Sequence, residues 1–376
     1  MKGFSTSLCY WVCISCVVGV ILSTVLAAPT PLQWVKVSDE RIKFLTASGG
    51  VLTGVFHYRV RTSLNQGYTW RAVSPVFPDS IYPADLDKFG VNWYSAFRDR
   101  GIYSASSSDT VWRPVNSGLP TGSDVFSIAA AGPLLIAGTN HGMYSLDDTT
   151  WANANGDGIP NFFGNNPHST ITIVRINVSG TTSFLATNFG GSYRGTLEPE
   201  GYKWTLQELL RYPKSLAAKG TYLFVASIGA FGPEGFPHRV ARSVDNGLTW
   251  VGSDSGLPSR SRTVSLIAMG NSLFAGLNDD DNVGTANVWR SEDDGNSWFP
   301  EAKGLPAGLV LTKLIASGST LFATTVSNGL WKLPDAAVEG VKVSRTKRTT
   351  QVTHPLSGIR LTGKRIQQPA KGSHRP

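Results

Sequence analysis

The sequence predicts an all-β protein: a seven-bladed β-propeller closed by an N-terminal strand, with a signal peptide before it and a basic C-terminal tail after it. The first observation behind this prediction is an octet ending in tryptophan, which occurs as SLNQGYTW (63–70), SVDNGLTW (243–250) and SEDDGNSW (291–298). The second is a pattern of short apolar segments and turns that repeats along most of the chain. Strand-like repeats of about 40 residues are typical of propeller blades.

Each repeat unit is expected to begin with two strands around a turn that contains glycine or another small residue. The clearest pair is LIAMGNSLFAGL (266–277) and LIASGSTLFATT (314–325). Four further segments follow the same plan, at 44–55, 127–139, 175–188 and 215–227, and a divergent copy lies around 91–97. Alanine and glycine at recurring positions allow close packing near an axis. A third strand follows each pair, so the sequence predicts seven similar units.

Tryptophan marks the start of each fourth strand. The seven residues of this set are separated by 36 to 53 positions, and they are Trp34, Trp70, Trp112, Trp151, Trp204, Trp250 and Trp298. The last unit ends at GLWKLP (329–334) without a fourth strand, while LQWVKVS (32–38) precedes the first unit. We therefore expect the strand at Trp34 to complete the last blade, which removes an open sheet edge. The predicted propeller domain spans residues 32–334.

The octet is predicted to be the turn between the third and fourth strands of a blade. Its Asp accepts hydrogen bonds from turn amides, its Gly supplies a positive φ, its Ser bonds across the turn, and its Trp buries a large ring between blades. We assign this structural role to Ser63, Trp70, Ser243, Asp245, Gly247, Trp250, Ser291, Asp293, Gly295 and Trp298.

The pattern S-x-D-x-G-x-T-W resembles the Asp-box (BNR) repeat of the sialidase-like superfamily, and with the blade pattern the resemblance covers residues 32–334. That family includes sialidases, β-glucan and xyloglucan hydrolases, a photosystem II assembly factor and many uncharacterised secreted proteins. The resemblance implies that the Asp boxes lie at the periphery of the ring and are structural. It therefore argues against a catalytic role for Asp245 or Asp293.

The N-terminus is interpreted as a signal peptide covering residues 1–27. An uncharged apolar run follows Lys2 and ends at Val25-Leu26-Ala27, where small residues suit signal-peptidase cleavage. An uncleaved membrane anchor is the alternative, because the run is about long enough to span a bilayer. Cys9, Cys13 and Cys16 all lie in this segment. We therefore expect a mature chain that is secreted or on the cell surface, without cysteine and without a transmembrane domain.

Positive charge is concentrated in the tail. Residues 335–376 hold nine Lys or Arg and two acids, whereas residues 29–334 hold 24 basic and 24 acidic residues. This balance argues against specific nucleic-acid binding by the folded domain. The tail is interpreted as a basic linker, and SGIRLTGKRIQQPAKG (357–372) is similar to the end of a type IX secretion sorting domain. A disordered basic tail is the alternative.

Ligand binding is expected in loops at the mouth of the central channel, on the face away from the octets. Candidate residues combine aromatic rings with charged and polar groups, which suits recognition of sugars or of a protein surface. They are Arg98, Asp99, Arg100, His141, Phe189, Phe231, Phe236, Asp279 and Asp281. Asn153, Asn155 and Asp157 resemble part of a calcium loop, but a plain turn is the better interpretation, so no metal or other cofactor is expected.

Catalysis is the weaker hypothesis. Glu234 and Asp280 could form a glycosidase carboxylate pair, but a sialidase would also need an arginine cluster, and no convincing set of three channel arginines stands out. We therefore predict a non-catalytic, monomeric module that binds an extracellular glycan or protein. The alternatives are a glycoside hydrolase, either sialidase-like or polysaccharide-degrading, and an assembly factor for a protein complex.

Overall fold

The computed structural model describes residues 33–156, 158–160, 172–179, 182–187, 191–198, 201–207, 213–227, 239–259, 261–279 and 287–334. All of these belong to one compact unit, Met1–Gly340. The predicted signal peptide and basic tail lie outside the described residues, so both stay predictions. Among the described residues, no helix has the length and apolar character needed to cross a bilayer.

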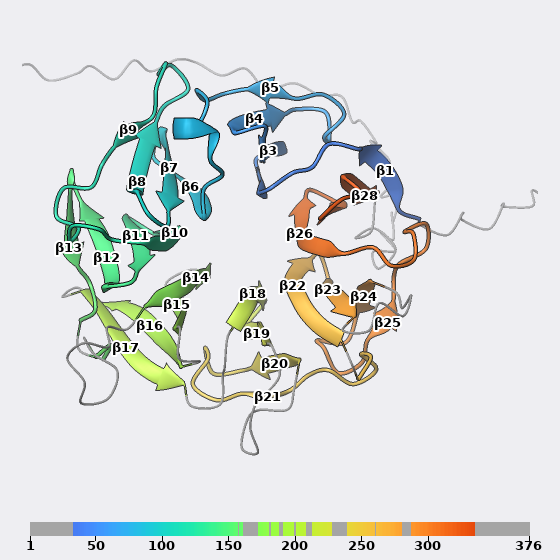
Figure 1. Ribbon diagram of the computed structural model, residues 1–376. Helices are drawn as coiled ribbons and strands as arrows, with labels where there is room; N and C mark the ends of the chain where they lie inside the picture. The colour runs from blue at the N-terminus through green and yellow to red at the C-terminus, as the bar shows by residue number, and fades with distance from the viewer. Residues whose placement is uncertain are drawn as a thin grey trace, which may run out of the picture. The chain divides into compact units, whose positions relative to one another are not determined.

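The described strands form seven antiparallel sheets of four strands each, arranged as blades around a ring (Figure 1). Blade 1 comprises β2 (Leu45–Ser48), β3 (Val51–Phe56), β4 (Arg59–Ser63) and β5 (Arg71–Ala72); blade 2 comprises β6 (Asp85–Phe89), β7 (Asn92–Phe97), β8 (Gly101–Ala105) and β9 (Arg113–Pro114); blade 3 comprises β10 (Val125–Ala131), β11 (Leu134–Thr139), β12 (Gly142–Asp147) and β13 (Thr150–Asn153). Blade 4 comprises β14 (Ile173–Ser179), β15 (Thr182–Thr187), β16 (Ser192–Glu198) and β17 (Gly201–Gln207); blade 5 comprises β18 (Pro213–Lys219), β19 (Tyr222–Ser227), β20 (Val240–Ser243) and β21 (Val251–Gly252). Blade 6 comprises β22 (Ser261–Met269), β23 (Ser272–Asp279), β24 (Val288–Ser291) and β25 (Phe299–Pro300); blade 7 comprises β26 (Leu311–Ser317), β27 (Thr320–Thr325), β28 (Leu330–Leu333) and β1 (Val35–Ser38). A short 3₁₀ turn, η1 (Pro78–Ser80), precedes blade 2. The predicted seven-bladed, all-β fold is confirmed.

The N-terminal strand closes the ring as predicted. β1 pairs with β28 in the sheet of blade 7, with Val35 opposite Lys332. Trp34 is buried, and its indole Nε1 donates to the carbonyl oxygen of Glu301 at 2.7 Å. The crossover residue Gly304 has φ +93°, and a Cβ there would meet the Trp34 carbonyl oxygen at 2.5 Å. The glycine of this crossover is therefore required by close approach of the closing strand.

The hydrophobic core lies between neighbouring blades. One cluster joins Phe274 and Val288 of blade 6 to Leu314 and Leu321 of blade 7, with Trp34 among them. Comparable clusters join the other neighbours, such as Phe184 of blade 4 with Val225 and Trp250 of blade 5. Since each blade buries the faces of its sheet against its neighbours, the blades stabilise one another.

A bulge recurs in the innermost strand of five blades. The register between first and second strands shifts at 125/127, 173/175, 213/215, 263/265 and 311/313. The residues that follow the bulge are therefore equivalent, and they are Ser127, Arg175, Ser215, Ser265 and Lys313. A bulge re-aims the side chains beside it, so it decides which residues face the channel.

In blades 3, 5 and 6, a serine at this position joins the inner strand to the next blade. The hydroxyls of Ser127, Ser215 and Ser265 accept the backbone N–H of Ile176, Leu266 and Leu314 at 3.0–3.1 Å. In blade 2 the carboxylate of Asp85 takes the same role toward Ile128, at 3.1 Å. These bonds satisfy amides at the inner edge of a sheet, which would otherwise lack a partner. In blades 4 and 7 the position is occupied by a cation instead.

The three octets form turns with the same hydrogen bonds. The buried hydroxyls of Ser63, Ser243 and Ser291 accept the N–H of the octet glycine at 2.7–2.9 Å. The next side chain of the pattern, Asn65, Asp245 or Asp293, accepts an N–H from the residue before tryptophan at 2.9 Å. Each turn is therefore closed by its own side chains.

A cation from the preceding blade holds each octet turn. Arg194 Nε donates to the carbonyl oxygen of Asn246 at 2.6 Å, and Arg242 Nη1 donates to that of Asp294 at 2.7 Å. Lys332 Nζ donates to Gln66 Oε1 at 2.7 Å. The contacted residue stands before the octet glycine and has a φ of 57–58° in all three turns. The octets thus join neighbouring blades.

Candidate functional site

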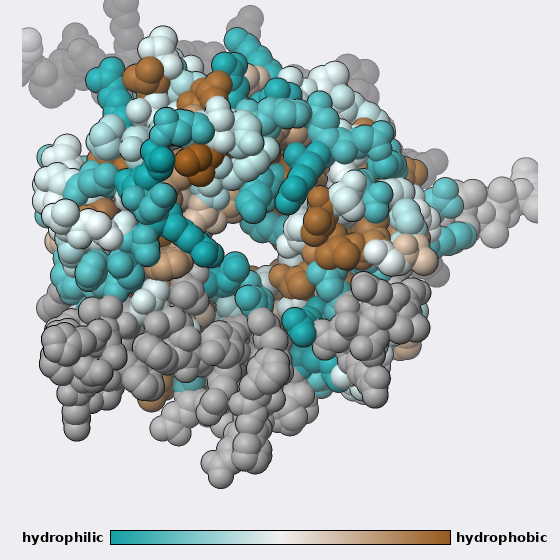
Figure 2. Space-filling model, in the orientation of Figure 1, coloured by the Kyte–Doolittle hydropathy of each residue, from teal (hydrophilic) through white to brown (hydrophobic). Residues whose placement is uncertain are grey.

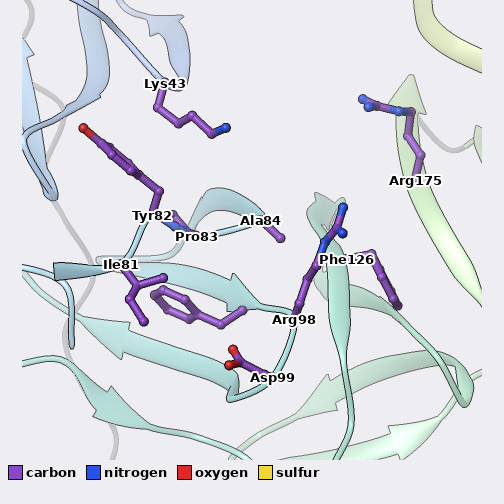
Figure 3. A pocket seen from close by; sticks show the side chains of 10 residues that line it. Lys43, Ile81, Tyr82, Pro83, Ala84, Arg98, Asp99, Phe126 and Arg175 are labelled. Carbon is purple, nitrogen blue, oxygen red and sulfur yellow. The ribbon is translucent and has the colours of Figure 1, made fainter. Parts of the chain in front are cut away.

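A cavity of about 660 Å³ lies among residues of blades 1 to 4. It is lined by Lys43, Ile81, Tyr82, Pro83, Ala84, Phe97, Arg98, Asp99, Phe126 and Arg175 (Figure 3). Lys43 precedes the first strand of blade 1, Tyr82 precedes that of blade 2, and Arg98 follows the second strand of blade 2. In an antiparallel blade these connections lie on one face, and the octets lie on the other. The volume is within the usual range for ligand pockets.

Three cations dominate the cavity. The charged groups of Lys43, Arg98 and Arg175 point toward the same open space (Figure 3). Arg98 also lies over the ring of Phe126, 5.4 Å from its centroid, so its guanidinium is held by a cation–π contact. Asp99 is the one acidic side chain among the residues that line the cavity. The site therefore favours a ligand with negative charge.

The wall of the channel continues this positive surface. Arg175 is followed around the ring by Lys214 of β18, Arg262 of β22 and Lys313 of β26, all on innermost strands. Burial lowers the pKa of Lys214, and the nearby charges of Arg175 and Arg262 lower it further. Figure 2 shows an opening at the centre of the ring with hydrophilic residues along much of its border.

Two carboxylates face the same region from β6. Burial raises the pKa of Asp85 and of Asp87, while hydrogen bonds and the charge of Lys313 act in the opposite direction. Burial likewise lowers the pKa of Lys313, whereas the two carboxylates raise it. These effects place Lys313 and both acids in one electrostatic environment.

All four oxygens of these carboxylates already accept hydrogen bonds. Asp85 Oδ2 accepts from the Ser127 hydroxyl at 2.9 Å and from the Ile128 N–H at 3.1 Å. Asp87 Oδ2 accepts from the Ala130 N–H at 2.8 Å. The Oδ1 atoms accept from the N–H of the following residue in each case. Asp85 and Asp87 therefore serve to join blades 2 and 3.

Among the residues proposed from the sequence, the structure brings together Arg98 and Asp99, which both line the cavity. Arg100 is half-buried and forms an ion pair with Asp79 of η1. The backbone N–H of His141 donates to Thr139 Oγ1 at 2.9 Å, in the loop between β11 and β12, and His141 does not line the cavity. Asp279 was expected in a loop, but its backbone ends strand β23.

Several proposed residues lie outside what the structure describes: Phe189, Phe231, Glu234, Phe236, Asp280, Asp281, Asp157 and the side chain of Asp279. Of the calcium candidates, Asn153 Oδ1 accepts from the Asn155 N–H at 3.1 Å, and Asn155 Oδ1 accepts from the Met143 N–H at 2.8 Å. These contacts belong to a turn. Within the described ranges, no group of three or more His, Cys, Asp or Glu could hold a metal ion.

The cations of the inner strands were not among the predicted site residues, because ligand binding was expected in loops. A signal for them exists in the repeat itself. In four successive units a basic residue stands just before or within the apolar first strand, as in VRINVS, PKSLAAK, SRTVSLIAM and LTKLIAS. Aligning these segments at the bulge would have placed Arg175 and Lys313 at one position and predicted that they face the channel.

No protein-family model and no curated protein matches the chain. Solved structures do resemble it. An extracellular domain of a one-component system from B. thetaiotaomicron matches with a TM-score of 0.55 and 14% identity, over 80% of this chain and 39% of that one. YCF48 bound to a D1 peptide matches with a TM-score of 0.56 and 15% identity, over 81% of this chain and 97% of that one. An ancestral GH74 enzyme matches with a TM-score of 0.54 and 16% identity, over 78% of this chain and 47% of that one.

These likenesses establish the fold and nothing finer. The chain spans less than half of the length of the first and third of these proteins. The neighbours include extracellular domains, a glycoside hydrolase and a propeller that binds a peptide. The protein is thus a seven-bladed β-propeller with a basic, partly aromatic cavity at the mouth of its channel. Fold alone does not assign a function, so evidence for a function must come from the residues of the site.

Proposed function

We propose that this chain is a secreted or cell-surface binding module that takes a glycan or protein ligand at the channel mouth without catalysing a reaction. One observation carries the proposal: Lys43, Arg98 and Arg175 converge on a cavity that also presents Tyr82 and Phe126. Aromatic faces beside convergent charged groups are typical of recognition sites. The secreted location rests on the predicted signal peptide.

The described carboxylates do not favour hydrolysis. A glycosidase needs two carboxyl groups across the scissile bond, about 5–10 Å apart. Asp99 has no acidic partner among the cavity-lining residues, and the oxygens of Asp85 and Asp87 accept hydrogen bonds from donors of β10 and of β6 itself. Glu234 with Asp280 stays the hydrolase hypothesis, since both lie outside the described residues.

The assembly-factor alternative has one supporting observation. YCF48, which this chain resembles over nearly the whole length of that protein, was solved with a peptide. This supports a propeller of this size as a receptor for a protein segment. The experiment below therefore tests peptides as well as glycans.

The proposal is tested by screening glycan and peptide arrays in parallel with a turnover assay, using wild-type protein and Tyr82→Ala. The matched control is Tyr68→Ala, which removes an exposed tyrosine of the blade 1 octet on the other face. We expect a ligand whose affinity falls about tenfold in Tyr82→Ala, remains in Tyr68→Ala, and is not turned over. Turnover abolished by Glu234→Gln or Asp280→Asn, or binding that depends on Tyr68 and not on Tyr82, would overturn the proposal.

A further inference from the structure

The cations of the channel wall are concentrated in a domain without net charge. Residues 29–334 hold equal numbers of basic and acidic side chains. Yet Arg175, Lys214, Arg262 and Lys313 stand on the innermost strands of four successive blades, 4 to 7. A general basicity of the chain does not explain this, because the excess of positive charge lies in the tail.

Two of these cations, Arg175 and Lys214, lie close enough to repel each other. The pKa of Lys214 is lowered by burial and then by the charges of Arg175 and Arg262. Within the described part of the chain, neither Arg175 nor Lys214 forms an ion pair with a carboxylate. Lys313 is attracted by Asp85 and Asp87, but hydrogen bonds to blade 3 hold those carboxylates in place. Repulsion among like charges is relieved when an anion binds between them.

The arrangement also differs from that of the other cations of the fold. Arg194, Arg242 and Lys332 each donate to an octet turn of the next blade. Their charge is used to join blades. Arg175 occupies the position at which Ser127 joins blade 3 to blade 4, but it lines the cavity and is exposed. At this position blade 4 therefore has a charged residue that lines the cavity, where blade 3 has a serine that joins two blades.

We propose that this channel wall is an oxyanion subsite, in which Arg175, Lys214, Arg262 and Lys313 take the carboxylate or sulfate groups of an acidic glycan held at the channel mouth. The inference rests on the proposed function and names its ligand class. Arginine binds such groups with paired N–H donors, and lysine acts as a mobile point charge. Four cations on successive blades suit repeated anionic groups better than a single one.

An acidic glycan fits the channel wall better than an acidic peptide. An extended peptide gains much of its affinity from backbone hydrogen bonds to an open strand edge. Here the inner-edge amides of Ile176, Leu266 and Leu314 are already satisfied by serine hydroxyls of the preceding blades. A sugar needs only partners for its oxygens and an apolar face, which the cations and Tyr82 provide.

The test uses calorimetric titration of the full chain with a tetrasaccharide of galacturonic acid, its neutral methyl ester, a sulfated glycosaminoglycan tetrasaccharide, a hexaglutamate peptide and inorganic sulfate. We expect at least one acidic oligosaccharide to bind. If that ligand is the galacturonic acid tetrasaccharide, its neutral methyl ester should bind more weakly by about tenfold or more. Lys214→Met and Lys313→Met should each weaken binding about tenfold, and Lys214→Met should do so without lowering the melting temperature. Lys203→Met and Arg71→Gln, which change exposed cations on outer strands, should leave the dissociation constant unchanged.

Several outcomes would overturn the inference: no acidic oligosaccharide binds, Lys214→Met and Lys313→Met leave the dissociation constant unchanged, or the peptide or free sulfate binds while the oligosaccharides do not. Failure of the broader function is distinguishable. If a neutral ligand binds and depends on Tyr82 but not on Lys214, the binding module stands and the oxyanion subsite falls. If no ligand depends on Tyr82, the binding module itself falls.

Discussion

On the octet side of the propeller, Arg242 and Lys332 donate to polar groups of the next blade's turn. At the channel mouth, Lys43, Arg98 and Arg175 point into an open cavity. The two regions use the same residue types, but among the described residues only the octet side supplies hydrogen-bond acceptors for them, while the partner of Arg98 is the ring of Phe126. Polar groups with internal partners stabilise a structure, whereas convergent charges without them are available for a ligand.

The carboxylates follow the same division. Asp245 accepts hydrogen bonds from Ser243, Leu248 and Thr249 of its own turn, and these bonds hold its pKa well below the ordinary value. Asp99, in contrast, lines the cavity and is exposed, and its ionic contact with Arg100 is long, at 3.8 Å from Nε to Oδ1. The comparison shows that an acidic residue repeated in the sequence can have a purely structural role. The candidate binding residues, in contrast, lie at positions where the blades differ from one another.

The largest expected effect comes from opening the ring on which both regions depend. Trp34→Ala removes a buried indole and its hydrogen bond to Glu301, and it should cost about 3–5 kcal/mol of the free energy of unfolding. Urea denaturation measures this loss. Trp70→Ala is the matched control, since Trp70 is only half-buried in blade 1 and should cost less. Equal losses in the two variants would show that the strand at Trp34 has no special part in closure.

The second prediction concerns the internal partners of an octet. Ser291→Ala leaves the buried N–H of Gly295 without its acceptor and removes a donor to Asp293, so it should cost about 1–3 kcal/mol. Ser297→Ala removes an exposed hydroxyl that also donates to Asp293, and its cost should be smaller. Urea midpoints of the two variants compare them directly. A larger loss in Ser297→Ala would contradict the role assigned to the buried hydroxyl.

The fold was predictable because its signals are local. Each octet carries its own acceptor, glycine and tryptophan, and the repeat pattern of the sequence ends at GLWKLP (329–334) without a fourth segment, which predicts that the segment at Trp34 supplies it. The site was predictable only in part. Arg98 and Asp99 lie in a loop, where ligand binding was expected, whereas Arg175 and Lys214 lie in innermost strands in which a bulge decides which side chains face the channel. Such a bulge is visible only in the pairing with the second strand, and convergence across blades is not a local property.

The third prediction is that removing a lysine has different effects on the free energy of unfolding in the two regions. Lys214→Met relieves repulsion from Arg175 and Arg262, so the free energy of unfolding should stay the same or rise by up to about 1 kcal/mol. Lys219→Met, on the same strand β18, leaves Asp294 of the next octet without its ion-pair partner and should lower stability by about 0.5–1 kcal/mol. Chemical denaturation at low salt measures both. A loss in Lys214→Met as large as that in Lys219→Met would mean that Lys214 is structural.

The fourth prediction separates the carboxylates by pH. Because the folded state raises the pKa of Asp85 and Asp87, their contribution to stability falls as pH rises above the ordinary value of 3.8 toward the raised pKa. Because hydrogen bonds from Ser297 and Ser291 outweigh burial at Asp293 and lower its pKa, and the octet also lowers that of Asp245, their contribution is lost as pH falls below 3.8. The free energy of unfolding, measured by denaturation between pH 3 and 7, should therefore fall both above and below pH 3.8. Asp87→Asn should reduce the fall at higher pH, and Asp293→Asn should reduce the fall at lower pH. If both variants changed the same side of the curve, the assignment would be contradicted.

The smallest effect is expected where the repeat already contains the substitution. Asp245→Asn should lower the urea midpoint at pH 7 only slightly, because blade 1 has Asn65 at the same place and forms the same turn. There, Asn65 Oδ1 accepts from the Ser63 hydroxyl at 3.0 Å and from the Thr69 N–H at 2.9 Å, and Nδ2 donates to Thr69 Oγ1 at 2.9 Å. Thr249 can turn its hydroxyl from donor to acceptor and restore the same set in blade 5. Ligand affinity should be unchanged, since the octet lies on the face away from the cavity. A marked loss of either quantity would mean that the charge of Asp245, and not only its geometry, is needed, and the division between a self-satisfied octet side and an open channel mouth would then fail at its best-defined residue.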